Sequence, residues 1–183
     1  MNYILLANGF EEIEAISVID ILRRAEIDLK IVSIYNTLQV SSDRNLNVTA
    51  DITISEIDKE NITSIILPGG SGYQNLENSE DTKNLLLYAN NHNKYLFAIC
   101  AAPSILGNLG ILNNKKATCY PGFEKYLIGS KKCNDDVCVD GKIITSRGPG
   151  TAHKFAYEIV NILKDKLLSD TIKTGMLFEW LRS

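Results

Sequence analysis

Short, uninterrupted runs of apolar residues alternate along this chain with segments in which apolar residues recur every three or four positions. Uninterrupted runs are typical of strands that are buried on both faces, as in a parallel sheet. The helical spacing predicts amphipathic helices with one buried face. The predicted strands span residues 3–7, 29–34, 64–67 and 95–99, and the predicted helices span 11–25, 79–90, 103–109, 151–163 and 170–180.

Two further segments have patterns of their own. Residues 38–54 contain short extended pieces with polar turns, in which apolar and polar positions alternate. Asp140-Gly141 separates two short apolar runs, which is a strong signal for a hairpin.

The predicted helices also have candidate capping residues: Ser79 and Thr151 stand where their hydroxyls can cap the helices that follow.

The alternation of strands and helices predicts right-handed crossovers and a mainly parallel central sheet with helices on both faces. The pattern contains no internal repeat, no low-complexity segment and no linker. We therefore expect a single α/β domain over residues 1–183, a flavodoxin-like three-layer sandwich.

Composition narrows the class of protein. Of the 183 residues 45% are hydrophobic, and 19 basic against 22 acidic residues leave a net charge of −3. This balance lacks the basic footprint of a nucleic-acid binder, and no apolar stretch reaches the roughly 20 residues that cross a bilayer. The chain begins with Met1-Asn2-Tyr3 and enters a strand directly, so no signal peptide is expected. Four cysteines are too few for a disulfide framework, which favours a cytoplasmic protein with free thiols.

Cys100 has the most informative position of the four cysteines. It lies between a predicted buried strand and a predicted helix, where ligands bind in open parallel sheets. This strand–turn–helix pattern is that of a nucleophile elbow, in which the helix start should favour the thiolate. Gly69-Gly70 follows another strand and could offer backbone N–H groups as an oxyanion hole. The alternatives are that Cys100 is a small buried hydrophobe and that the glycine pair is a plain tight turn.

Four motifs in register resemble those of the ThiJ/PfpI superfamily, in the branch of the Parkinson-disease-associated deglycase and its bacterial relatives. The resemblance covers nearly the whole chain. Its motifs are Gly-Phe-Glu-Glu-Ile-Glu (9–14), Leu-Pro-Gly-Gly (67–70), Ala-Ile-Cys-Ala-Ala-Pro (98–103) and Thr-Ser-Arg-Gly-Pro-Gly-Thr (145–151).

The resemblance assigns roles to individual residues. It implies that Cys100 is the reactive cysteine and that Glu14 is the acid whose carboxyl hydrogen-bonds the sulfur. A carboxyl buried beside a thiolate should have a raised pKa and serve as a proton shuttle. The resemblance also implies that the backbone N–H groups of Gly70 and Ala101 line the pocket. It places three further residues near the pocket or a dimer interface: Arg44, Arg147 and Pro149.

The chain departs from the family pattern at two positions. Tyr120 stands where many relatives have a histidine, and its phenol is a poor base near neutral pH. Glu14 must then supply most of the proton transfer. Ala101 stands where the protease-like branch has a histidine, and the His-x-Glu pair of class I glutamine amidotransferases is missing. We therefore expect neither a protease nor an amidotransferase.

The remaining thiols and imidazoles are expected to be structural. Cys133 and Cys138 have the wrong spacing for a zinc knuckle or a redox Cys-x-x-Cys motif, and Cys138 is interpreted as packing. Cys119 is a weaker candidate for resolving an oxidised Cys100. His92 and His153 are interpreted as structural or exposed residues. No cluster has the spacing of metal ligands, so we expect no metal and no cofactor.

The resemblance implies one of two activities. The first is an enzyme in which a Cys100 thiolate attacks reactive aldehydes or glycated groups, with Glu14 as the proton shuttle, as in glutathione-independent glyoxalases and deglycases. The second is an oxidative-stress sensor or chaperone in which Cys100 is oxidised to the sulfinate without turnover. In both cases the resemblance implies a homodimer, with the first helix and Arg44 near the interface.

Overall fold

The computed structural model describes residues 1–178, and its centre is a seven-stranded sheet. All neighbouring strands in this sheet pair in parallel except β10, which pairs with β11 in the antiparallel sense. The order across the sheet is β10 (Val137–Asp140), β11 (Ile143–Ser146), β7 (Tyr95–Ile99), β6 (Ser64–Leu67), β1 (Asn2–Leu6), β2 (Leu29–Ser33) and β5 (Ile52–Thr53).

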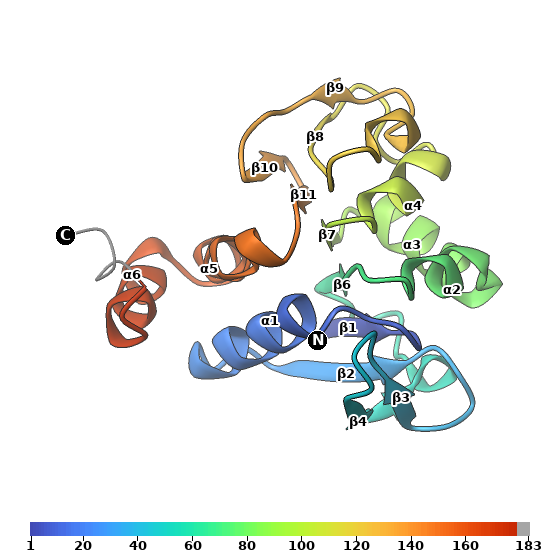
Figure 1. The fold of residues 1–183 in the computed structure, drawn as a ribbon, viewed down its shortest axis with the longest axis horizontal. Helices are drawn as coiled ribbons and strands as arrows, with labels where there is room; N and C mark the ends of the chain where they lie inside the picture. Colours follow the sequence, from blue (N-terminus) through green and yellow to red (C-terminus); the bar gives the residue numbers. More distant parts are fainter. Residues whose placement is uncertain (179–183) are drawn as a thin grey trace.

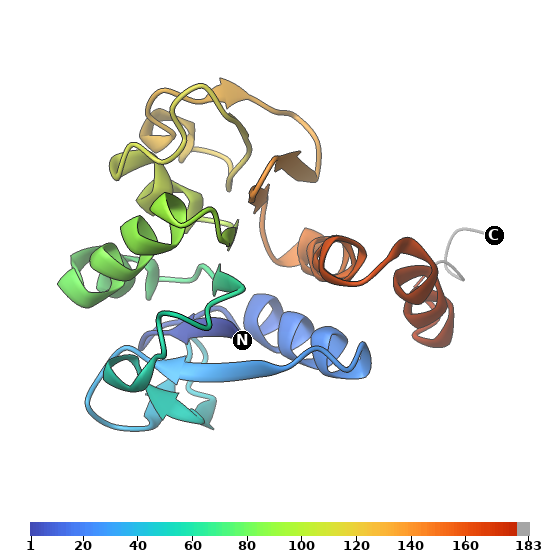
Figure 2. The same cartoon turned by 180° about the vertical axis from the view of Figure 1, so that it is seen from behind.

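Helices cover both faces of this sheet. Figure 1 and Figure 2 show α1, α5 and α6 on one side and α2, α3 and α4 on the other. The helices are α1 (Glu12–Arg24), α2 (Tyr73–Asn78), α3 (Glu80–Asn91), α4 (Pro103–Asn108), α5 (Ala152–Leu163) and α6 (Lys166–Gly175), with 3-10 turns at Ile54–Glu56, Glu124–Tyr126 and Pro149–Thr151. The expected three-layer α/β sandwich is therefore confirmed.

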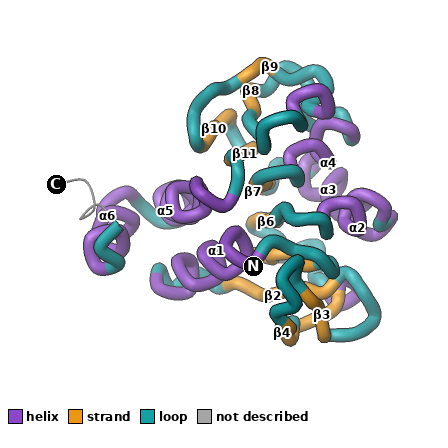
Figure 3. The backbone as a smooth tube through the Cα atoms, in the orientation of Figure 1, coloured by secondary structure: helices purple, strands orange, loops and turns teal. Residues whose placement is uncertain are grey.

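Two small sheets lie outside the central one. Strand β3 (Gln39–Ser41) pairs with β4 (Asn47–Thr49) in the antiparallel sense, and β8 (Lys116–Ala117) pairs in parallel with β9 (Lys131–Lys132). Figure 3 shows β8 and β9 connected by long loops beyond β10 and β11. The pattern at residues 38–54 predicted extended pieces, whereas β8, β9 and the six-residue α2 were not predicted.

Alternation along the buried strands divides the core into two parts. In β1, Ile4 and Leu6 belong to the cluster that packs against α1 and α5. Tyr3 and Leu5 belong to the cluster that packs against α3 and α4. Both faces of the strand are therefore apolar, which explains why it reads as one continuous hydrophobic run.

The helix ends follow the sequence closely, with two exceptions. The Ser79 hydroxyl accepts the Thr82 amide at 3.2 Å, as its place before α3 predicted. Thr151 does not cap α5 through its side chain, because its hydroxyl bonds Ser146 Oγ at 2.7 Å and the Gly148 carbonyl oxygen at 2.9 Å instead. The last helix begins at Lys166 rather than at Asp170, and the part of the expected helix at 179–180 lies outside the described residues.

Strand order positions the candidate site. From β2 the order runs through β1, β6 and β7 to β11, so the sheet reverses its winding direction between β1 and β6. In open sheets of this kind, ligands bind beyond the carboxyl ends of the strands at such a reversal. No helix within residues 1–178 combines the length and the apolar character that crossing a membrane requires.

Candidate active site

Cys100 forms the sharp turn between β7 and α4. Its φ of +66° lies in the left-handed region, which residues other than glycine rarely adopt and which costs conformational energy. Its backbone N–H donates to the Ser146 carbonyl oxygen at 3.0 Å, which holds the turn against β11. The residue is 9% exposed. The turn thus presents the sulfur at the carboxyl edge of the sheet, almost removed from water, in the geometry of a nucleophile elbow.

Glu14 reaches the same point from the first turn of α1. This helix begins where the Glu11 carboxylate accepts the Glu14 amide at 2.8 Å, so Glu11 is a capping residue. Glu14 itself is fully buried, and its Oε2 accepts the Gly69 amide at 2.7 Å. A further hydrogen bond joins its carboxyl to the Cys100 thiol. Its other oxygen, Oε1, is buried without a hydrogen-bond partner among the described residues.

The environment of Glu14 favours its neutral form. Burial raises the pKa of the carboxyl to about 7, and the charges of Glu11 and Asp43 contribute in the same direction. The hydrogen bonds from Gly69 and Cys100 oppose this shift but are weaker than the loss of water. Near neutral pH the carboxyl therefore exists in both protonation states, which suits a group that must accept and return a proton.

The pKa of the Cys100 thiol is shifted upward, whereas the sequence predicted a downward shift. Its pKa is raised to about 12, first by burial and then by the charge and hydrogen bond of Glu14. The amides of Gly70 and Ala101 hydrogen-bond the sulfur and lower the pKa, but by less than burial raises it. Burial thus acts against the thiolate that the helix start was expected to favour, whereas the two amides act in its favour.

Gly69 is a site residue that the sequence reasoning did not single out from the glycine pair. A Cβ at this position would lie 2.6 Å from Cys100 Cβ, 2.9 Å from Cys100 Sγ and 2.9 Å from Glu14 Oε2. Only a residue without a side chain lets the thiol and the carboxyl meet here. Gly70 has a separate role, because its φ of +85° requires glycine and its Cβ would lie 2.4 Å from the Gly9 carbonyl oxygen.

Tyr120 lies beside the site. Its backbone N–H donates to the Cys100 carbonyl oxygen at 2.8 Å. Its ring is 46% exposed and contacts Gly148, where an added Cβ would lie 3.1 Å from Tyr120 Cδ2 and 4.0 Å from Glu14 Oε1. The two histidines are elsewhere: His92 stacks on Tyr88 and His153 stacks on Phe178.

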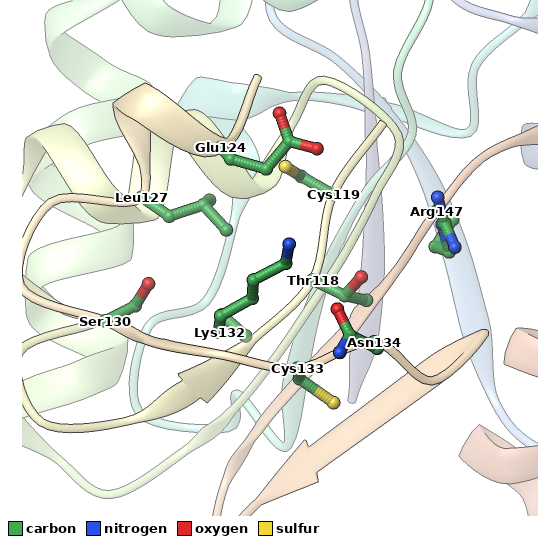
Figure 4. Close-up of a pocket in the computed structure, with 10 residues that line it drawn as sticks. Thr118, Cys119, Glu124, Leu127, Ser130, Lys132, Cys133, Asn134 and Arg147 are labelled. Atoms are coloured by element: carbon green, nitrogen blue, oxygen red, sulfur yellow. The ribbon is translucent and has the colours of Figure 1, made fainter. Parts of the chain in front are cut away.

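The remaining predicted site residues surround the thiol–carboxyl pair at its edges. Arg44 is exposed, and its backbone N–H donates to Glu12 Oε1 at 2.7 Å. Pro149 is half-buried and begins a 3-10 turn. Arg147 lines a neighbouring cavity of about 210 Å³ that contains Cys119, and Cys100 is not among its lining residues. Figure 4 shows this cavity between Arg147 and the Glu124 region.

The described part of the chain offers no ligand set for a metal. Within residues 1–178, no three His, Cys, Asp or Glu side chains gather in a way that could hold an ion. All four cysteines are free thiols. The groups that the arrangement beside β7 offers for chemistry are Cys100, Glu14 and the surrounding amides.

Comparisons with known proteins agree with this geometry. The DJ-1/PfpI family model matches residues 2–162. Protein dj-1beta of Drosophila melanogaster is 33% identical over 177 residues, which cover 95% of each chain. Protein DJ-1 homolog B of Arabidopsis thaliana is 38% identical over 157 residues, which are 85% of this chain but 36% of that longer protein. A Pyrococcus horikoshii protein named as a deglycase is 28% identical over 162 residues, covering 87% of this chain and 97% of that one.

Solved structures show the same architecture. The structure of oxidised DJ-1 from Toxoplasma gondii superimposes with a TM-score of 0.92 at 34% identity, covering 96% of this chain and 97% of that one. The crystal structure of Drosophila melanogaster DJ-1beta gives a TM-score of 0.91 at 31% identity, with 96% of both chains covered.

Proposed function

Because the chain belongs to the DJ-1/PfpI family, we propose that it is a cysteine-dependent enzyme that acts on reactive carbonyl compounds, of the glutathione-independent glyoxalase or deglycase type. The observation that carries the proposal is the hydrogen-bonded pair of Cys100 and Glu14, in which a carboxyl with a pKa of about 7 adjoins a buried thiol. The name of the Pyrococcus horikoshii relative, a deglycase, supports a glycated substrate.

The first step follows from the two pKa values. The Cys100 sulfur adds to the aldehyde carbon of an α-oxoaldehyde such as methylglyoxal while the ionised Glu14 takes the thiol proton. Glu14 then delivers that proton to the former carbonyl oxygen, which completes a hemithioacetal. The amides of Gly70 and Ala101, which hydrogen-bond the sulfur, are placed to stabilise negative charge beside it.

The second half uses the same carboxylate. Glu14 removes the proton from the carbon that bears sulfur and returns it to the neighbouring carbon, while the hydroxyl proton passes to the oxygen of that neighbouring carbon, which converts the hemithioacetal into a thioester. Water then cleaves the carbon–sulfur bond, releases lactate and restores the Cys100 thiol. Atoms balance as methylglyoxal plus water giving lactate. Deglycation would transfer the carbonyl-derived carbon of an early glycated cysteine, lysine or arginine to the Cys100 sulfur, as the bond from that carbon to the glycated sulfur or nitrogen breaks and the free thiol or amine leaves with a proton.

The test is lactate formation from methylglyoxal by the purified protein without glutathione. Cys100→Ala should abolish it, and Glu14→Gln should reduce it at least tenfold. Activity of the unaltered protein should rise with pH up to about 7, as Glu14 ionises. Cys138→Ala is the matched control, because it removes a thiol that is also buried but lies on β10. Full activity in Cys100→Ala would exclude the proposal.

A second candidate is supported by the hydrogen-bond donors around the same sulfur. Oxidation of Cys100 to the sulfinate would place oxygens near the amides of Gly70 and Ala101 and a protonated Glu14, so the protein could act as an oxidative-stress sensor. Mass spectrometry after mild peroxide separates the two functions. Gain of two oxygens on Cys100 alone, without lactate formation by the reduced protein, would favour the sensor.

A further inference from the structure

Two hydrogen bonds and one strand pairing bring Cys133 and Cys138 together outside the site described above. The Cys133 amide donates to the Ala117 carbonyl oxygen at 3.0 Å, which extends the β8–β9 ladder. The backbone N–H of Thr118, the residue after Ala117, donates a hydrogen bond to Thr145 Oγ1 at 2.9 Å. In the β10–β11 hairpin, Thr145 is the register partner of Cys138. Both cysteines therefore flank the same point, where β8 meets the edge of the central sheet.

The side chains complete this arrangement. A hydrogen bond joins the Cys133 and Cys138 thiols, and the Cys133 thiol also donates to Asp135 Oδ2 at 3.6 Å. Cys133 is half-buried and lines the cavity of Figure 4, whereas Cys138 is only 2% exposed. The pair thus consists of one thiol that solvent can reach and one behind it.

Cys119 lines the same cavity but is oriented differently. Figure 4 shows its sulfur directed toward Glu124, whereas the Cys133 sulfur points away from both. Consistent with this view, burial and then the charge of Glu124 raise the pKa of the Cys119 thiol to about 11. The partner of Cys133 in this geometry is therefore Cys138.

We propose that Cys133 and Cys138 form a reversible intrachain disulfide when the protein is exposed to hydrogen peroxide. The sequence spacing had argued against a redox pair, because four residues separate the cysteines. The structure removes that objection, since the chain bends at Asp135 and Asp136 and returns to the same place. The disulfide is independent of the carbonyl chemistry at Cys100.

The reaction proceeds in two balanced steps. The Cys133 sulfur attacks one oxygen of peroxide, the O–O bond breaks, and sulfenic acid and water form. Asp135 is the hydrogen-bond acceptor for the thiol proton that leaves. The Cys138 sulfur then attacks the Cys133 sulfur, the S–O bond breaks, and hydroxide leaves as water with the Cys138 proton. Two thiols and one peroxide give one disulfide and two waters.

Reaction should begin at Cys133 rather than at Cys138. Burial raises the pKa of the Cys138 thiol to about 12, and its hydrogen bond to Cys133 adds to this shift. A thiol of such high pKa is a poor first target for peroxide, and Cys138 is also shielded from solvent. Peroxide therefore oxidises the half-buried Cys133 thiol, and the buried Cys138 thiol resolves the sulfenic acid.

The experiment uses the full chain carrying Cys100→Ser, so that oxidation at the candidate catalytic thiol cannot interfere. The protein is treated with peroxide, alkylated with N-ethylmaleimide and digested with trypsin. Lys132 and Lys142 flank one peptide that contains both cysteines. The expected product is this peptide two hydrogens lighter and without N-ethylmaleimide. Reduction before alkylation should restore two N-ethylmaleimide groups.

Three variants test the assignment. Cys119→Ser should still form the disulfide to the same extent, as the matched control within the cavity. Cys138→Ser should form none and should leave a Cys133 sulfenic acid that dimedone captures. Cys133→Ser, a change at a half-exposed position, should leave Cys138 reduced. A doubly alkylated peptide after peroxide, a link from Cys133 to another peptide, or a Cys133 sulfinate in the chain that retains Cys138 would each overturn the proposal.

Discussion

At the residue scale, the candidate site contains two buried groups, Glu14 and Cys100, that can exchange a single proton. Glu14 and Cys100 are both largely removed from water, and burial raises the pKa of each. The carboxyl titrates at about 7 and the thiol at about 12, so Glu14 is the first of the two to lose its proton as pH rises. In the proposed mechanism Glu14 is therefore the base, and Cys100 becomes a nucleophile only as its proton leaves.

The first prediction concerns the pH dependence of stability. The pKa of Glu14 is higher in the folded protein, at about 7, than its ordinary value of 4.5, so the folded state holds the proton more tightly. The associated stability is fully present below about pH 4.5 and is lost as pH rises through 7. At about 1.4 kcal/mol per unit, the loss approaches roughly 3 kcal/mol. Urea unfolding from pH 4 to 8 should show this decline in the unaltered protein and a flatter profile in Glu14→Gln.

A matched control is Glu12→Gln. Burial raises the pKa of this half-buried carboxyl, but hydrogen bonds from Ser42 and the Arg44 amide lower it by more, so its pKa lies below the ordinary value. Its variant should keep the decline of the unaltered protein between pH 5 and 8. A Glu14→Gln protein whose stability falls as steeply as that of the unaltered protein would show that another group is responsible.

The second prediction tests the close approach at Gly69. An alanine Cβ would meet Cys100 Sγ and Glu14 Oε2 at 2.9 Å, so the thiol and carboxyl must separate. Gly69→Ala should lower lactate formation at least tenfold and cost about 1–3 kcal/mol of stability through overpacking. Gly150→Ala is the control, because nothing lies within 4 Å of its added Cβ. Unchanged activity in Gly69→Ala would mean that the two groups need not touch.

The sequence contained part of this site. The position of Cys100 directly after a buried strand was enough to single it out, because the end of such a strand can be recognised from the hydrophobic pattern. Glu14 could not be separated from Glu11 and Glu12 without the family resemblance, since all three lie in one helical turn. The direction of the Cys100 pKa shift depends on burial by segments distant in sequence, and a local pattern does not contain that information.

At the scale of elements, the turn that holds Cys100 is supported by strands on either side. Its amide bonds Ser146 at the end of β11, and its carbonyl oxygen accepts the Tyr120 amide from the segment after β8. Thr145 connects these two supports, because its hydroxyl accepts the Thr118 amide at 2.9 Å. Strands of two residues such as β8 and β9 leave no periodic signal, so this support was not predicted from the pattern.

The third prediction follows from that connection. Thr145 is fully buried, so Thr145→Val preserves its shape but leaves the Thr118 amide without an acceptor. An orphaned buried donor costs about 1–3 kcal/mol, which thermal or urea unfolding can measure. Activity should fall as well, because the Tyr120 segment loses its anchor. Thr145→Ser keeps the hydroxyl and should retain most of the activity. Equal loss in both variants would indicate that packing of the methyl group matters instead.

At the scale of the whole molecule, strand order and the two helical layers bring the site together. Glu14, Gly69 and Cys100 follow β1, β6 and β7, which are consecutive in the sheet but far apart in the chain. The alternation of strands and helices was sufficient to predict this architecture, because each long element has a clear period. Helix α1 both supplies Glu14 and presents Ile13 and Ile16 to solvent, with exposures of 52% and 38%.

The last prediction is that this exposed face of α1 is covered by a second copy of the chain. Ile13 and Ile16 are three residues apart, so they lie on one face of the helix. They line a hollow with His153 and Met176, next to Glu12, which holds the Arg44 amide. The family resemblance places a homodimer interface at this helix and near Arg44. Ile13→Glu combined with Ile16→Glu should therefore halve the mass measured by sedimentation equilibrium, since charges would be buried without partners.

Leu167→Glu on α6, at a position that is 79% exposed, is the control for this interface and should leave the mass unchanged. A monomeric unaltered protein, or a dimer that survives both α1 substitutions, would exclude this interface.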